Sequence, residues 1–360
     1  MTTPNLWKSV GTYMSLYQTV SNYPVMFTNS RPRLKTLTGF TSLQFFWVSI
    51  FINSFATMCG IFVTIGRWLK IPMFADIPLW KVLFVGGVTA IGIIQVVSHL
   101  SLYALGATLS LAFDRFLEME ETLHQVTGGF SPHVAKGHDF QPMVLNCIAY
   151  LGIIIPLPGS LFVIAIHGDP AGVFMYTVFE NMVANANINL GLTVFRFCTA
   201  FIAVREVYRI LWLILFFSAT LSRFVFKFSR QIERLWNPGL FIDIYTQLLI
   251  TYSIVTEITE LALLGTMAAG LVIGIGVNFT VLKLYNHISL LLYINIAMLT
   301  VSLPVLMNST LPLAAEAYEK TSKLLKVNYL RLFKLQKSTL TIYYKNYVDY
   351  TIVVLMYVHV

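Results

Sequence analysis

Long runs without charge dominate the chain and decide what it can fold into. Five stretches contain no Lys, Arg, Asp or Glu, and each is at least 22 residues long: 36–66, 82–113, 140–168, 261–282 and 284–315. A helix needs about 20 apolar residues to cross the hydrocarbon core of a bilayer. A soluble chain of 360 residues that buried so much apolar surface would have almost none left to face water. The pattern predicts an all-α fold, a polytopic membrane helical bundle.

The composition agrees with a membrane environment. The chain is 57% hydrophobic and 11% charged, whereas about 25% of residues are charged in a typical soluble protein. A net charge of +8 would suggest nucleic-acid binding in a soluble protein. In a membrane protein it reflects Lys and Arg gathered on cytoplasmic loops. We therefore expect membrane lipid around the chain and no nucleic-acid partner.

The uncharged runs predict a single transmembrane domain over residues 1–360 with about seven spans. The expected spans are about 40–66, 82–108, 143–166, 199–224, 261–283, 286–308 and 338–360. The connections 223–258 and 311–337 are expected to be helical and cytoplasmic. The fourth span has an alternative near 182–204, which would place Arg196 in its middle. That placement would cost several kcal/mol unless the charge were shielded.

The distribution of basic residues predicts the orientation. Sixteen Lys and Arg fall on the side that holds the N-terminal tail and residues 114–142, 223–258 and 316–337, against seven on the other side. Because cytoplasmic loops carry the excess of Lys and Arg, the N-terminus is expected to be cytoplasmic. Seven spans then place the C-terminus outside. This orientation is opposite to that of a G-protein-coupled receptor and predicts a multi-pass plasma-membrane protein of another kind.

The sequence contains no motif that indicates an enzyme. It has no HExxH, no GxSxG, no phosphate-binding loop and no Cys/His cluster with metal-ligand spacing. We therefore predict no catalytic residues, no metal site and no cofactor. The three cysteines lie in or beside apolar segments, which is typical of packed free thiols.

Polar residues inside the apolar segments are the candidates for function. Gln95, His99 and Tyr103 recur at intervals of four and share one helix face. They could form hydrogen bonds between helices or line a ligand pocket. Glu206 and Arg209 are one helical turn apart. They could form a structural salt bridge at a helix end or face a watery cavity that opens outward.

Several features together resemble the arthropod gustatory/odorant receptor superfamily. The layout of seven spans with an inside N-terminus is similar, as is a basic connection before the seventh span. Pro156-Leu157-Pro158, Gly168-Asp169-Pro170 and the stretch Tyr344–Asp349 look like chemoreceptor-like proteins of springtails and related arthropods. The Gln-Phe signature that usually ends the seventh helix of gustatory receptors is missing from Tyr357–Val360. We therefore expect a divergent or C-terminally truncated member.

The resemblance implies a function. Members of this family assemble as homo- or hetero-tetramers whose seventh helices line a non-selective cation pore, and a small organic tastant or odorant opens it. Carried over to this chain, the ligand pocket would involve His99, Tyr103, Glu206 and Arg209, and the pore would be lined by Tyr343, Tyr347, Tyr350 and Val354. The alternative is a secondary transporter or another polytopic membrane protein. Transporters usually show inverted repeats and broken helices, and no repeat is visible here.

Overall fold

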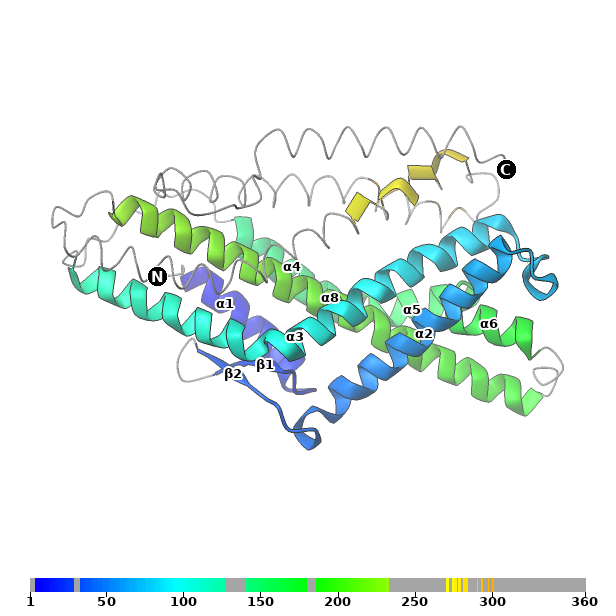
Figure 1. The fold of residues 1–360 in the computed structure, drawn as a ribbon, viewed down its shortest axis with the longest axis horizontal. Coiled ribbons are helices and arrows are strands. Elements are labelled where there is room, and N and C mark those ends of the chain that lie inside the picture. Colours follow the sequence, from blue (N-terminus) through cyan, green and yellow to red (C-terminus); the bar gives the residue numbers. More distant parts are fainter. Residues whose placement is uncertain are drawn as a thin grey trace.

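The protein is mostly helical, as the expectation of an all-α bundle requires (Figure 1). The computed structural model describes residues 4–28, 33–126, 140–179 and 186–232, with isolated positions between 270 and 300. Within this part, three segments are long and apolar enough to cross a membrane: Thr41–Trp68, Leu79–Thr122 and Pro156–Val178. The seventh predicted span 338–360, its pore-lining candidates and the connection 311–337 lie outside the described residues, as do most of spans 261–283 and 286–308.

The N-terminal segment folds into the bundle. Helix α1 (Pro4–Tyr13) continues into a π-helical turn at Met14–Gln18, and a hairpin of β1 (Val25–Phe27) and β2 (Leu34–Thr36) follows. The strands are antiparallel, with Met26 opposite Lys35. Val25, Phe27 and Leu34 are buried while Lys35 is exposed. The apolar side of this short hairpin therefore anchors it to the helices.

Helices α2 (Gln44–Trp68) and α3 (Leu79–Val126) are joined by a short loop with a 3₁₀ turn at Pro72–Phe74, and they pack against each other. Contact is closest at Gly60, where an added Cβ would collide with the Thr89 hydroxyl and lie 3.1 Å from Pro170 Cβ. Small residues permit such close helix approach in membranes. The opposite face of α2 carries exposed apolar side chains spaced by three, four or seven: Phe45, Val48, Phe51, Met58 and Phe62. A face of this kind suits lipid.

The predicted third span, 143–166, is divided into α4 (Phe140–Ile154) and α5 (Pro156–Ala165). Pro156 and Pro158 have no N–H to donate to the preceding turn, so two helical hydrogen bonds, on either side of Leu157, are lost there. Helix α6 (Pro170–Val178) follows after a short connection. Its N-terminus is capped by the Asp169 carboxylate, which accepts a hydrogen bond from the Gly172 N–H at 2.7 Å.

Helix α8 (Ala186–Ile232) is longer than the predicted fourth span 199–224 and includes most of the alternative 182–204. Its last residues form the start of the predicted cytoplasmic connection 223–258. Helices α4 and α5 both pack along α8, which runs nearly the length of the molecule (Figure 1). One continuous helix therefore joins the two ends of the bundle.

The main core lies where α1, the hairpin, α3, α4 and α8 meet, and it is rich in aromatic rings. Trp212 stacks on Tyr13 with ring centroids 4.1 Å apart, and on Phe216 at 5.1 Å. Stacked and edge-to-face rings each add about 0.5–1.5 kcal/mol beyond the area that they bury. This core attaches the N-terminal segment firmly to α8.

Candidate functional site

A buried ionic cluster links α3 to α8. His99 Nε2 lies 3.4 Å from Glu206 Oε2, and Arg209 Nη1 lies 3.4 Å from Glu206 Oε1. None of the three residues is more than 6% exposed. Glu206 and Arg209 occupy neighbouring turns of α8, as their spacing predicted. Three of the four predicted pocket residues thus lie together.

The polar stripe on α3 connects helices. His99 Nδ1 lies 2.7 Å from the Gln95 carbonyl oxygen, one turn earlier, and Gln95 Nε2 donates to the Ala203 carbonyl on α8 at 3.4 Å. Gln95 and His99 therefore both contact α8, through Ala203 and Glu206. Of the two roles expected for this stripe, hydrogen bonding between helices is the one that these contacts show. Tyr103 continues the stripe but is 39% exposed. It packs edge-to-face on Trp47, at 4.9 Å, and takes no part in the ionic cluster.

The N-terminal segment supplies most partners of Arg209. Its guanidinium donates to Ser21 Oγ at 2.7 Å, to the Ser21 carbonyl at 2.9 Å and to the Tyr13 hydroxyl at 3.3 Å. The ring of Tyr23 lies over the guanidinium at 3.9 Å, close enough for a cation–π interaction. The hydrogen-bond partners Ser21 and Tyr13 are 188 and 196 positions from Arg209 in the chain, and no pattern in the sequence indicated them.

Two polar atoms of aromatic side chains beside this cluster lack partners among the described residues. The Tyr23 hydroxyl and the Trp212 indole N–H are buried, and within the described residues neither forms a hydrogen bond. Burial raises the pKa of Tyr23 well above its ordinary value, so its hydroxyl stays protonated and can donate. Buried polar groups are nearly always hydrogen-bonded to protein or to ordered water. Among the described residues, both atoms are exceptions to this rule.

A second buried ion pair joins Asp169, at the start of α6, to Arg196 on α8. Arg196 also lies under the ring of Tyr176, at 5.0 Å, and the Tyr176 hydroxyl donates to Asn189 at 2.7 Å. The charge of Arg196 is therefore shielded. Shielding was the condition under which the sequence allowed Arg196 to lie in the middle of a span. The pairing with Asp169 was missed, although a charged residue directly after an uncharged run was a usable signal.

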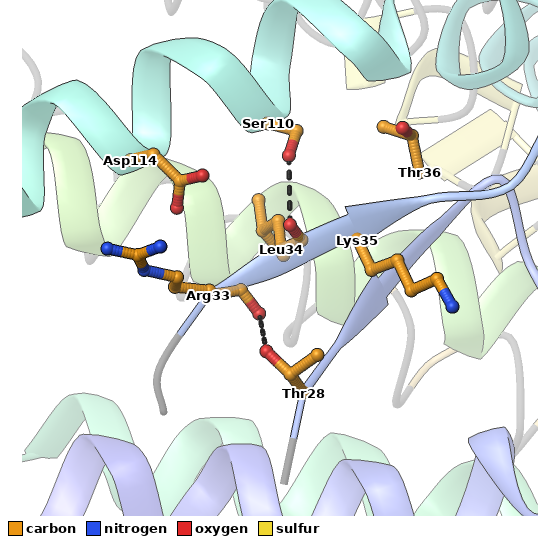
Figure 2. A pocket seen from close by; sticks show the side chains of 7 residues that line it. All are labelled: Thr28, Arg33, Leu34, Lys35, Thr36, Ser110 and Asp114. Carbon is orange, nitrogen blue, oxygen red and sulfur yellow. Dashed lines mark hydrogen bonds between the residues drawn. The ribbon is translucent and has the colours of Figure 1, made fainter. Parts of the chain in front are cut away.

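An open pocket of about 530 Å³ lies between the hairpin and α3 (Figure 2). Its walls are polar, and none of its lining residues was singled out as functional in the sequence. The lining residues are Thr28, Arg33, Leu34, Lys35, Thr36, Ser110 and Asp114. The pocket is separate from the ionic cluster, since the two share no residue. Among the described residues no group of three or more His, Cys, Asp or Glu could hold a metal ion.

Within the described residues, three helices are long and apolar enough to cross a membrane, α2 has an exposed apolar face, and ion pairs are buried between helices. These features are typical of helical membrane proteins. Comparison with known protein families, with curated proteins and with solved structures finds no match. The relationship to the gustatory/odorant receptor superfamily therefore stays a prediction from the sequence.

Proposed function

We propose that the protein is a chemosensory receptor subunit of the plasma membrane. It acts as a ligand-gated, non-selective cation channel of the gustatory/odorant receptor type, opened by a small organic molecule. The observation that carries the proposal is the buried cluster of His99, Glu206 and Arg209, with the unpartnered polar atoms of Tyr23 and Trp212 beside it. Ionisable residues within membrane helices generally have functional roles because they are costly to bury.

The surroundings of the cluster suit a small organic ligand. Aromatic rings of Tyr23 and Phe46 lie 5.7 and 5.5 Å from the His99 ring. Ligand sites are typically lined by apolar and aromatic side chains with a few placed polar groups. A molecule with one hydrogen-bond acceptor could bind to the Tyr23 hydroxyl and exclude water with its apolar part.

The coupling from ligand to channel would pass through α8. Glu206 and Arg209 are on this helix, whose 47 residues continue past the bundle core toward the connection 223–258. A ligand that changes the contact between Arg209 and the N-terminal segment would shift α8 as a unit. In the proposed tetramer, with seven spans in each subunit and a cytoplasmic N-terminus, this shift would widen a pore lined by Tyr343, Tyr347, Tyr350 and Val354.

The first test is topology and assembly. Epitope tags at both ends are stained in intact and in permeabilised cells. The molecular mass of the purified protein in detergent then gives its oligomeric state. The proposal expects an inside N-terminus, an outside C-terminus and a tetramer. A C-terminus inside the cell, or a monomer, would overturn the pore arrangement. Whole-cell recording of a tetramer against a panel of tastants and odorants then measures the current, with Glu206→Gln expected to weaken the response.

The alternative, a secondary transporter, is favoured by one observation. The helix break at Ile155, between α4 and α5, resembles the discontinuous helices that form substrate sites in transporters. Uptake of radiolabelled substrate without a ligand-evoked current would support a transporter, and current without uptake would support the channel.

A further inference from the structure

Two side-chain hydrogen bonds hold together the walls of the pocket between the hairpin and α3. Ser110 Oγ on α3 donates to the Leu34 carbonyl at 3.0 Å, and Thr28 Oγ1 donates to the Arg33 carbonyl at 2.7 Å (Figure 2). The first bond fastens strand β2 to α3, and the second closes the hairpin. Side chains on β2 are thereby held at a fixed place beside α3.

The pocket lies where the apolar segments end. The uncharged run 36–66 begins directly after Lys35, and the uncharged run 82–113 ends directly before Asp114. Because α2 and α3 pack as an antiparallel pair, both limits fall at the same end of the pair. Trp47 and Tyr103 contact each other at this end, and such aromatic residues gather at the membrane–water interface. In a membrane, the end of the pair that holds the pocket would then lie toward the headgroups.

The charges of the pocket are of both signs. Arg33 and Lys35 are exposed and contribute two positive charges, while Asp114 contributes one negative charge. Oδ1 of Asp114 is buried and has no hydrogen-bond partner in the described part of the chain. A matching ligand would carry an acidic group for the two cations and a donor for this oxygen.

We propose that this pocket binds the headgroup of an anionic aminophospholipid, of the phosphatidylserine type, from the adjoining leaflet. The lipid phosphate would interact with Arg33 and its ammonium would donate to Asp114 Oδ1, while Lys35, whose side chain points away from Arg33 (Figure 2), would add electrostatic attraction at the edge of the pocket. The headgroup carries a net charge of −1, which complements the pocket's net charge of +1. A volume of about 530 Å³ lies within the usual range of small-ligand sites. The inner leaflet is rich in such lipids, which agrees with the proposed cytoplasmic N-terminus.

This inference requires a bilayer around the chain but not a chemosensory role. The full-length protein is placed in phosphatidylcholine nanodiscs that contain a minor fraction of phosphatidylserine or of phosphatidylglycerol, which is anionic but has no ammonium. Native mass spectrometry measures how much of each lipid stays bound. The wild-type protein is expected to retain phosphatidylserine more strongly than phosphatidylglycerol.

Three variants separate the contributions. Arg33→Gln and Lys35→Gln should each weaken binding of both lipids about fivefold, the effect of one basic residue at an anionic surface. Asp114→Asn should abolish the preference for phosphatidylserine but leave phosphatidylglycerol bound, which also shows that this variant is folded. The matched control is Arg115→Gln on the same helix: Arg115 is exposed, pairs with Glu118 at 3.2 Å and is outside the pocket. This variant should retain both lipids as strongly as the wild-type protein does.

Two results would overturn the inference. One is equal retention of the two lipids by the wild-type protein, because Asp114 would then recognise no ammonium. The other is a loss of binding in Arg115→Gln as large as that in Arg33→Gln, which would indicate unspecific attraction. As a competitor, soluble glycerophosphoserine is added at the same concentration as the phosphatidylserine headgroups in the nanodiscs. Failure to displace the lipid supports a site that is filled from the bilayer, whereas full displacement contradicts it.

Discussion

Arg196 on α8 and Asp169 at the start of α6 form an ion pair in which the guanidinium contacts both carboxylate oxygens. Arg196 Nε lies 2.9 Å from Oδ2 and 3.1 Å from Oδ1, and Nη2 also donates to Oδ1. The two residues are 1% and 4% exposed. Because the same carboxylate caps α6 through the Gly172 N–H, one side chain both begins a helix and neutralises a charge on another.

Removing one member of this pair should be strongly destabilising. Asp169→Asn leaves the Arg196 charge buried without a counter-ion, and such losses cost about 3–5 kcal/mol. Thermal unfolding of the purified protein in detergent measures the effect. The exposed pair Arg115–Glu118 is the control, since Glu118→Gln should cost less than about 1 kcal/mol. The double variant Asp169→Asn/Arg196→Gln should lose less than the two single losses combined, and simple additivity would contradict the pairing.

The N-terminal segment should loosen when Arg209 becomes Lys. Lysine keeps the charge but cannot reach Ser21 Oγ, the Ser21 carbonyl and the Tyr13 hydroxyl together. Each hydrogen bond to a charged group contributes about 1.5–3 kcal/mol. Amide hydrogen exchange is expected to speed up over residues 13–28 and to stay unchanged in α2. The exposed Arg115→Lys should leave both regions as they are, and unchanged exchange in Arg209→Lys would show that the contacts are weak.

Close packing of α2 on α3 should make Gly60 intolerant of a side chain. In Gly60→Ala the new methyl group would collide with the Thr89 hydroxyl and press on Pro170. Overpacking of this kind costs about 1–3 kcal/mol. Gly87 is the matched control because a Cβ there meets nothing within 4 Å, so Gly87→Ala should stabilise α3 by up to about 1 kcal/mol. Equal melting temperatures for the two variants would contradict the packing.

Replacing an exposed apolar residue by Asp should weaken membrane insertion only where that residue faces lipid. Met58 on α2 and Val20 in the N-terminal segment are 57% and 56% exposed. Met58→Asp would bring a carboxylate into lipid, at a cost of about 2.5–3.5 kcal/mol, whereas Val20→Asp would face water. The fraction of protein that resists alkaline extraction from membranes should fall for Met58→Asp alone. A similar fall for both variants would place Val20 in lipid as well.

The helices could be predicted from the sequence because their signals are local. The uncharged runs 36–66 and 82–113 coincide with most of α2 and the greater part of α3. The one-turn spacing of Glu206 and Arg209 also predicted their contact. The length of α8 was not predicted, since Arg196 and Arg205 interrupt its apolar pattern, and the charge of Arg196 is compensated by Asp169 from another element.

The partners of the buried charges depend on the whole fold. Asp169 meets Arg196 across 27 positions, and Ser21 meets Arg209 across 188. Apolar length is a property of neighbouring residues, so the amino-acid sequence was sufficient to predict long apolar helices, three of which the described residues contain. Contacts between distant residues depend on how the helices cross and where the N-terminal segment docks. The enclosure of Arg209 by Tyr13, Ser21 and Tyr23, and the pocket beside Asp114, therefore became visible only once the chain was folded.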